Sequence, residues 1–470
     1  MPFIDDAAIV ARALDRYRIE SAARTQPVLR QPRMAEVFAE LGLEKLANEG
    51  GLTGARLESF LETYLASTTH LHHPGYMGHQ VAVPHPSGAL GAFVDGFTNN
   101  AMAIYEMGPA AASIEYFVIN WLLGHVGWVP SPLPGEPEPA AMAGGGVLTH
   151  GGSLANLTAL VAARSRLVPD VWSHGAPGDL ALIAPAACHY SIARAAGILG
   201  IGRNAVYAAE VDRRGVVIPE RLPACLQRAT HDGRRVVAVV ANACSTAVGL
   251  YDPLREIGAF CRARGLWFHV DGAHGAGALL SPSHRQLLDG LELADSLVWD
   301  AHKMLRAPTL CAAVLVRDRR TLDTAFQQEA SYLFHEKVQP GFDFMPRAVE
   351  CTKAGLGLRL FAVIGAMGTR GLSAYVDRQY ALARQAWELL REAPGVECAV
   401  EPEANILCFR MAGDDAEQLR LRGALIAEGS FYLTTTGFDG RRWLRLVFVN
   451  PDTSISDVQR LRDRLHALRG

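Results

Sequence analysis

Positions 296–304 read SLVWDAHKM, an apolar strand that ends in polar residues. Similar apolar runs lie at 180–184, 236–241, 266–270 and 312–316, and amphipathic helical patterns separate them. Strands that alternate with helices predict a mostly parallel sheet with helices on both faces, which is an α/β fold. In such a sheet, groups that contact ligands gather at the carboxyl ends of the strands. The polar end of the quoted run is therefore a candidate site.

Three regions are expected along the chain, because 470 residues are too many for one hydrophobic core. Residues 1–75 have apolar side chains at helical spacing and are expected to form an N-terminal helical arm. Residues 76–365 hold the strand–helix alternation and are expected to form a large domain. Residues 366–470 contain strand patterns near 406–411 and 443–449, followed by a helix, and are expected to form a small α+β domain.

The composition is that of an ordinary soluble globular protein, with 49% apolar and 20% charged residues. A net charge of -3 gives no reason to expect nucleic acid or an anionic membrane as a partner. The first residues lack the basic segment and apolar run of a signal peptide, and the longest apolar stretch, 236–251, is too short to span a bilayer. Eight cysteines without a CxxC pair indicate reduced thiols, so a cytoplasmic location is expected.

Two strand ends carry groups suited to chemistry. Lys303 ends the run at 296–304, and its amine can form an imine with an aldehyde. Asp271 ends the apolar run LWFHVD at 266–271 and offers a carboxylate at the same kind of position. Considered alone, a strand-end lysine is more often a solvated loop residue, and a strand-end aspartate is more often a helix N-cap. The neighbouring strand ends decide between these interpretations.

Three further strand ends complete a pattern. Gly152 and Ser153, in HGGSLAN at 150–156, open a helix whose free amides suit an anion. His189 follows an apolar strand and can stack on a ring, and Ser245, in NACST at 242–246, offers a hydroxyl. Each has an ordinary structural explanation as a loop, core or capping residue. Together they match what pyridoxal 5'-phosphate (PLP) needs, namely an amine, an acid for the pyridine nitrogen, a phosphate cradle and a stacking group.

On these motifs the chain resembles the group II PLP-dependent decarboxylases, the class of glutamate, cysteine-sulfinate and aromatic amino-acid decarboxylases. The resemblance runs from about residue 70 to 455 and is most specific around 73–74, 151–156, His189, 271–274 and 296–305. It implies the fold type I architecture of aspartate aminotransferase, PLP as the cofactor, and a homodimer with shared active sites. It also implies an amino-acid substrate.

The resemblance implies a role for each matching residue. Lys303 would form the Schiff base and Asp271 would pair with the pyridine nitrogen. His189 would stack on one face of the ring and act in catalysis, while Ala273 would pack on the other face. The remaining cofactor contacts that the resemblance implies are Gly152, Ser153, Ser245 and His302.

Four more positions concern the substrate. Tyr332, in ASYLF at 330–334, matches a mobile-loop tyrosine that protonates Cα after carbon dioxide leaves. Arg445, in WLRLVFVNP at 443–451, matches an arginine that binds the substrate α-carboxylate, and an unpaired cation buried in a strand would otherwise be costly. His79 stands where acid-specific members have glutamine, and Ala103 replaces a bulky aromatic residue. Decarboxylation of an L-amino acid is therefore expected, and a small acidic substrate is the leading candidate.

Other functions stay open. The alternative substrates are an aromatic or non-proteinogenic amino acid, and the alternative reactions on the same scaffold are transamination, carbon–carbon bond formation and oxidative deamination. Tyr332 favours simple decarboxylation, and intact Lys303, Asp271 and His189 argue against a non-catalytic scaffold. No metal is expected, because the histidines between 70 and 85 match no tetrahedral site and have no cysteine near them.

Overall fold

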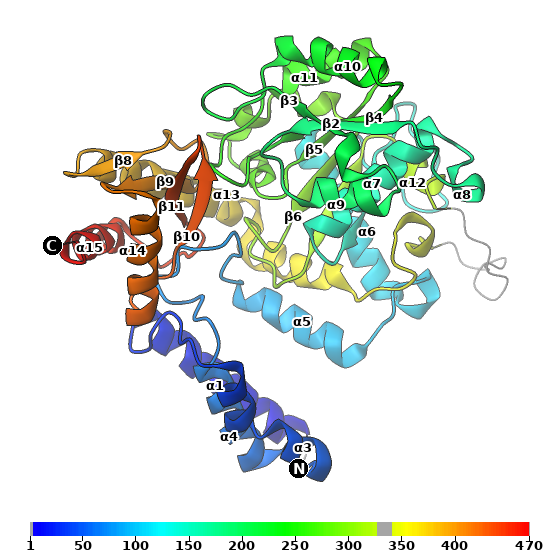
Figure 1. Ribbon diagram of the computed structural model, residues 1–470. Coiled ribbons are helices and arrows are strands. Elements are labelled where there is room, and N and C mark those ends of the chain that lie inside the picture. Colours follow the sequence, from blue (N-terminus) through cyan, green and yellow to red (C-terminus); the bar gives the residue numbers. More distant parts are fainter. Residues whose placement is uncertain (1–2, 327–340, 470) are drawn as a thin grey trace. The chain divides into compact units, whose positions relative to one another are not determined.

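The computed structural model describes residues 3–326 and 341–469 (Figure 1). They divide into two compact units. Pro84–Tyr380 forms the larger unit, and the segment up to Val83 joins the segment from Ala381 onward in the smaller one. The three-part division at 75 and 365 that the sequence suggests stays a prediction.

The larger unit is built on a seven-stranded sheet with the strand order β1-β7-β6-β5-β4-β2-β3. Neighbours from β3 to β6 pair in parallel, whereas β7 is antiparallel to both β6 and β1. Since β7 opposes both partners, β1 runs in the same direction as β6. The carboxyl ends of β1, β2, β4, β5 and β6 therefore lie on one edge of the sheet. The strands are β1 (Gly145–Thr149), β2 (Leu180–Pro185), β3 (Val206–Ala209), β4 (Arg235–Asn242), β5 (Trp267–Asp271), β6 (Ser296–Asp300) and β7 (Ala312–Val316).

Helices cover both faces of this sheet. Successive strand residues point to opposite faces. Trp267 lies in a buried cluster with α7 and α9, while a Cβ on Gly258 of α11 would come within 3.2 Å of the ring of the next residue, Phe268. The helices are α5 (Pro86–Thr98), α6 (Pro109–Val126), α7 (Gly152–Leu167), α8 (Val171–His174), α9 (Ser191–Ile198), α10 (Leu222–His231), α11 (Leu254–Ala263), α12 (Arg320–Asp323) and the start of α13 (Leu356–Arg391). Short 3-10 helices are η1 (Tyr105–Met107), η2 (Arg203–Ala205), η3 (Pro219–Arg221), η4 (Gly275–Leu280), η5 (Arg285–Leu288), η6 (Leu291–Leu293) and η7 (Met345–Arg347).

The smaller unit joins N-terminal helices to a four-stranded antiparallel sheet with the order β10-β11-β9-β8. Met77 links the two ends of the chain, because its amide donates to Tyr432 and its carbonyl accepts from Val447. The elements are α1 (Phe3–Ala22), α2 (Met34–Leu41), α3 (Leu43–Glu49), α4 (Gly54–Ala66), β8 (Val396–Cys398), β9 (Ile406–Met411), α14 (Asp415–Glu428), β10 (Thr434–Phe438), β11 (Arg441–Val447) and α15 (Ile455–Ala467). Helix α13 ends in this unit, after a non-helical residue at Gly368.

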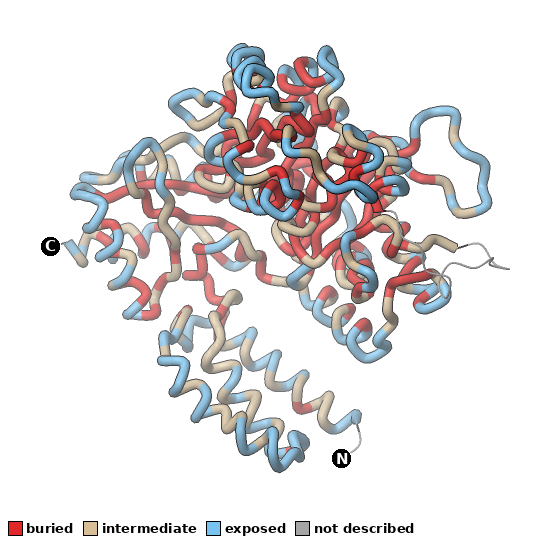
Figure 2. The backbone as a smooth tube through the Cα atoms, turned by 45° about the vertical axis from the view of Figure 1, so that its right-hand side comes forward, coloured by how far each residue is buried: buried red, intermediate tan, exposed pale blue. Residues whose placement is uncertain are grey.

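The α/β fold class expected from the sequence is confirmed, and the five apolar runs correspond to β2, β4, β5, β6 and β7. Every residue of β1, β2, β5, β6 and β7 is buried, which explains their continuous apolar character (Figure 2). Strands β1 and β3 carried no clear signal, because β1 begins with two glycines and β3 has only four residues. In the ranges that the structure describes, every helix is too short or too polar to cross a membrane.

A fully buried ion pair ties α6 to the segment that precedes α13. The side chains of Glu115 and Lys353 are 0% and 2% exposed. The Lys353 ammonium donates to Glu115 Oε1 and to the carbonyl of Leu148, and the Leu148 amide donates to the same carboxylate at 2.9 Å. Burial raises the pKa of Glu115, whereas the charge of Lys353 acts to lower it. The pair therefore fixes the start of α13 against β1.

Removal of one partner should destabilise the protein, because the other charge stays buried without compensation. We expect Lys353→Met to lower the free energy of unfolding by about 3–5 kcal/mol. Glu115→Gln combined with Lys353→Met should recover much of that loss. Urea unfolding of the single and double variants measures both effects, and additive losses in the double variant would contradict a direct charge coupling.

Candidate active site

Lys303 stands in a turn at the carboxyl end of β6. The His302 amide donates to the carbonyl of Cys311 at 3.1 Å, and the Lys303 amide donates to the carbonyl of Asp300 at 3.2 Å. These bonds hold the turn against the residue that precedes β7. The ammonium of Lys303 lies 3.1 Å from Asp300 Oδ2, and its side chain is 18% exposed. The amine is therefore partly accessible, and it stands on a turn that backbone hydrogen bonds hold in place.

Asp271 ends β5, the strand next to β6, and is buried. Its Oδ2 accepts from Asn156 Nδ2 at 3.0 Å, and its Oδ1 accepts from the Ala273 amide at 3.2 Å. The Ala273 carbonyl in turn accepts from the Asp300 amide at 3.0 Å. The turn that holds Asp271 is thus bonded directly to the end of the strand that leads to Lys303.

A buried chain of hydrogen bonds orients Asp271. Asn156 Oδ1 can only accept, so the hydrogen in its 2.9 Å contact with His269 comes from His269 Nε2. His269 Nδ1 then accepts from Ser296 Oγ at 2.8 Å, and Ser296 Oγ accepts from Trp267 Nε1 at 2.8 Å. Burial lowers the pKa of His269 to about 4, so the ring is neutral near pH 7. Sequence reasoning missed Asn156 and His269, although Asn156 lies in the glycine-rich motif and His269 shares a strand face with Asp271.

His189 follows β2 on the same edge of the sheet. Its Nδ1 lies 2.8 Å from Ser191 Oγ, which also accepts from Asn156 Nδ2 at 2.9 Å. Burial lowers the pKa of His189; the charge of Asp271 opposes this and that of Lys303 adds to it. His189, Asp271 and Lys303, which lie far apart in the sequence, therefore form one electrostatic neighbourhood.

The amino end of α7 lies against the same group. Gly151 has φ +106°, which turns the chain from β1 into α7. A Cβ on Gly152 would lie 2.7 Å from both carboxylate oxygens of Asp300. Ser153 is half-buried one residue further along the helix. Gly152, Ser153 and Lys303 are thus brought together, with Asp300 between them.

The Ser245 loop is bonded to the turn that carries Asp271. The Ala243 amide donates to the Asp271 carbonyl at 2.8 Å, and the Gly275 amide donates to the Ala243 carbonyl at 3.0 Å. Ser245 is buried, and its hydroxyl accepts from the Leu250 amide at 3.2 Å. The structure therefore places Ser245 at the same edge, within a closed loop.

His79 and Arg445 belong to the smaller unit, where they lie close to each other. Arg445 is buried on β11 and donates to the Gly78 carbonyl at 3.5 Å. His79 Nε2 lies 2.8 Å from the hydroxyl of Tyr432, a residue that sequence reasoning did not single out. Burial lowers the pKa of His79, and the charges of Arg445 and Arg422 lower it further. Tyr332 lies outside the described residues.

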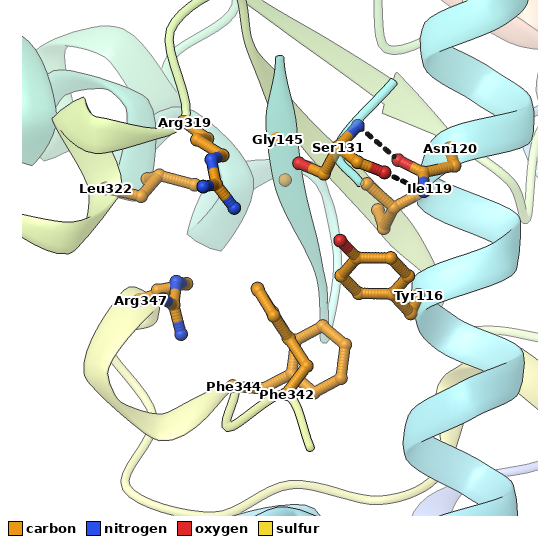
Figure 3. A pocket seen from close by; sticks show the side chains of 11 residues that line it. Tyr116, Ile119, Asn120, Ser131, Gly145, Arg319, Leu322, Phe342, Phe344 and Arg347 are labelled. Carbon is orange, nitrogen blue, oxygen red and sulfur yellow. Dashed lines mark hydrogen bonds between the residues drawn. The ribbon is translucent and has the colours of Figure 1, made fainter. Parts of the chain in front are cut away.

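A cavity of about 10 Å³ lies near the amino end of β1 (Figure 3). Arg319 and Arg347 stand opposite Tyr116 and Phe342, and Ser131 is bonded to the side chain of Asn120 on α6. Because Lys303 lies at the carboxyl edge, this cavity is at the opposite end of β1 from the candidate site. Its volume has room for about one water molecule and not for an amino acid.

Comparison with known proteins agrees with this arrangement. The model of the pyridoxal-dependent decarboxylase conserved domain matches residues 58–412. Acidic amino acid decarboxylase of Mus musculus is 31% identical over 391 residues, which cover 79% of this chain and 69% of that protein. Cysteine sulfinic acid decarboxylase of Mus musculus is 31% identical over 417 residues, which cover 84% of this chain and 82% of that protein.

Solved structures show the same fold. The crystal structure of mouse CSAD has a TM-score of 0.86 and 28% identity, and the match covers 98% of both chains. A crystal structure of Oryza sativa TDC with PLP and tryptamine has a TM-score of 0.86 over 99% of this chain, at 21% identity. The fold type I architecture is thereby confirmed. The chain belongs to the pyridoxal-dependent decarboxylase family, and it is an amino-acid decarboxylase with PLP as its cofactor.

Proposed function

We propose that this enzyme converts a small acidic L-amino acid, of the glutamate, aspartate or cysteine-sulfinate type, to the corresponding amine. The positive charge around His79 carries the proposal. Burial lowers the pKa of His79, and the charges of Arg445 and Arg422 lower it further. Because Arg445 is assigned to the α-carboxylate that all amino acids share, Arg422 is the nearby cation left to favour an anionic side chain. The names of two relatives, acidic amino acid decarboxylase and cysteine sulfinic acid decarboxylase, support the same substrate class.

We assign the cofactor contacts to the group around Lys303. Lys303 would hold the cofactor covalently, and Asp271 would face the pyridine nitrogen. The hydrogen bonds from Asn156 and from the Ala273 amide support this role, because they keep the Asp271 carboxylate in one orientation. When bound, PLP supplies an electron sink for the bond to the departing carboxylate.

The phosphate is assigned to the amino end of α7, at Gly152 and Ser153. The free amides of a helix start favour an anion, and α7 has 16 residues. A Cβ at position 152 would lie 2.7 Å from both carboxylate oxygens of Asp300, so the glycine lets the start of α7 approach the end of β6 closely. Ser245 and His302 would contact the cofactor edge and the phosphate. The residues present therefore fit PLP.

The remaining roles concern the ring faces and the substrate. His189 would stack on one face of the cofactor ring and Ala273 would pack on the other. Arg445 would bind the substrate α-carboxylate, and His79 would contact the substrate side chain. Tyr332 would return a proton to Cα, a task suited to a phenol, although it lies outside the described residues.

We further propose a homodimer with shared active sites. Helix α5 exposes large apolar side chains at helical spacing, and a second copy of this chain would cover them. They are Leu90, Phe93, Val94 and Phe97. None of the eight cysteines, all of which the structure describes, forms a disulfide, which supports a cytoplasmic location. The charge of -3 supports neither a nucleic-acid nor a membrane partner.

The assignment of the phosphate to the start of α7 predicts that a side chain at position 152 weakens PLP binding. Gly152→Ala should weaken PLP binding by about tenfold or more, because the new methyl group meets the Asp300 carboxylate. Gly197→Ala on α9 is the matched control, since a Cβ there meets nothing within 4 Å. Titration of each apoenzyme with PLP, followed by absorbance, measures the affinity. Equal affinities would remove Gly152 from the cradle.

The proposed substrate class predicts the outcome of an amino-acid panel. Purified holoenzyme should release carbon dioxide and amine in equal amounts from a small acidic amino acid, and faster than from aromatic ones. Lys303→Ala should fold but release neither product, because no amine remains to hold the cofactor. A preference for aromatic substrates would contradict the proposed class, and carbon dioxide without amine would contradict simple decarboxylation.

Replacements of Arg445 and His79 should affect the kinetics in different ways. Arg445→Lys loses a bidentate fork and should raise KM about tenfold or more for every substrate alike. His79→Gln should instead change the ranking among substrates. Initial rates over the same panel test both variants. If Arg445→Lys changed the ranking and His79→Gln did not, the two proposed roles would be reversed.

A further inference from the structure

Asp300 is a buried carboxylate that no role assigned so far requires. It is the last residue of β6, and its side chain is 3% exposed. Its Oδ2 lies 3.1 Å from Lys303 Nζ and 3.6 Å from His302 Nε2. Its Oδ1 is buried and has no hydrogen-bond partner within the part of the chain that the structure describes. A carboxylate in such a place is costly unless a charge compensates it.

The charges around Asp300 identify the compensating group. His302 shares its turn, and a Cβ on Gly152 at the start of α7 would lie 2.7 Å from both carboxylate oxygens. Burial lowers the pKa of His189 at the end of β2, and the charge of Asp300 acts against this shift. Asp271 is already held by Asn156 and the Ala273 amide. Among residues 3–326 and 341–469, Asp300 is the only carboxylate that pairs with Lys303.

We propose that Asp300 is the counterion of Lys303, both before the cofactor binds and after it is attached. The inference rests on the assignment of Lys303 as the residue that holds PLP. Attachment joins Nζ of the lysine ammonium to the aldehyde carbon and releases one water molecule. The nitrogen gives up two protons to that water and keeps one, so it carries a positive charge before and after the step. A buried anion beside Nζ, 3.1 Å away before attachment, would stabilise the positive charge in both states.

This role differs from that of Asp271, which is assigned to the far end of the cofactor. The counterion role also explains why Asp300 Oδ1 has no hydrogen-bond partner among the described residues. A counterion that bonded every lone pair to backbone amides would lose much of its field at Nζ, since those dipoles would neutralise it. Asp300 instead directs its charge at Lys303 and His302.

Asp300→Asn tests the proposal, because it keeps the shape and removes the charge. The readout is the long-wavelength absorbance band of the holoenzyme at saturating PLP, which reports the proton on the Schiff-base nitrogen. We expect the pH midpoint at which this band disappears to fall by about 1–3 pH units. Asp289→Asn, at an exposed carboxylate paired with Arg255, is the matched control and should leave the midpoint unchanged.

Each outcome has a distinct meaning. If the wild-type protein shows no such absorbance band, or if the Lys303→Ala variant still shows it, the assignment of Lys303 as the residue that holds PLP fails. If wild type binds PLP at Lys303 and Asp300→Asn keeps the same midpoint, only the counterion fails. Should Asp300→Asn not retain PLP, Asp300→Glu replaces it. A midpoint near wild type then supports the proposal, and a midpoint that falls by 1 unit or more, about tenfold in proton affinity, overturns it.

Discussion

The common direction of five strands is the constraint on which the site depends. Strands β1, β2, β5 and β6 are buried along their whole length, and so is β4 after its first residue. A polar side chain inside these strands lowers the stability of the fold unless it is hydrogen-bonded, whereas one at a strand end can meet solvent or a ligand. Because β7 is antiparallel to both β6 and β1, the order of the sheet keeps β1 pointing the same way as the others. Five chain segments that span more than 150 positions thus deliver their polar ends to one edge.

Asp271 and Asp300 are treated differently by their surroundings. Each carboxylate oxygen of Asp271 accepts a hydrogen bond, from Asn156 and from the Ala273 amide, and the neutral His269 behind Asn156 donates to the Asn156 amide oxygen. Asp300 keeps one oxygen unpaired, beside a lysine. The hydrogen bonds of Asp271 fix the orientation of its carboxylate, whereas the charge of Asp300 acts on the Lys303 ammonium. If Asp271 faces the pyridine nitrogen and Asp300 is the counterion of Lys303, as proposed, the site would use both properties.

Much of this organisation could be predicted from the sequence, because continuous apolar runs ending in polar residues are a strong local pattern. That pattern identified Lys303, Asp271 and His189 as residues of one edge. It could not identify Asn156 or His269, since a polar residue inside a helix or a strand has the same local signature whether or not it bonds across the core. Their partnership depends on how α7 lies over β5, which is a tertiary fact.

The same limit explains two other omissions. Strand β1 begins with glycines, which have low strand propensity, and it is stabilised by its place beside β7. Tyr432 meets His79 only because the N-terminal segment is bonded beside β10 and β11, more than 350 positions later. Pairing between the two ends of a chain leaves no local pattern. The assignments of Arg445 and His79 to the substrate stay predictions, as does that of Tyr332.

The one-way chain from Trp267 through Ser296, His269 and Asn156 to Asp271 has a consequence for divergence. Each bond runs in one sense, because Trp267 Nε1 and Asn156 Nδ2 can only donate and Asn156 Oδ1 can only accept. A replacement that removes the polar group at one link would leave its neighbour in the core without that hydrogen-bond partner. Over evolutionary time these five positions should drift as a block, preserved together in some lineages and exchanged together in others. A signal of covariation should therefore link a helix and two strands that no stretch of sequence joins.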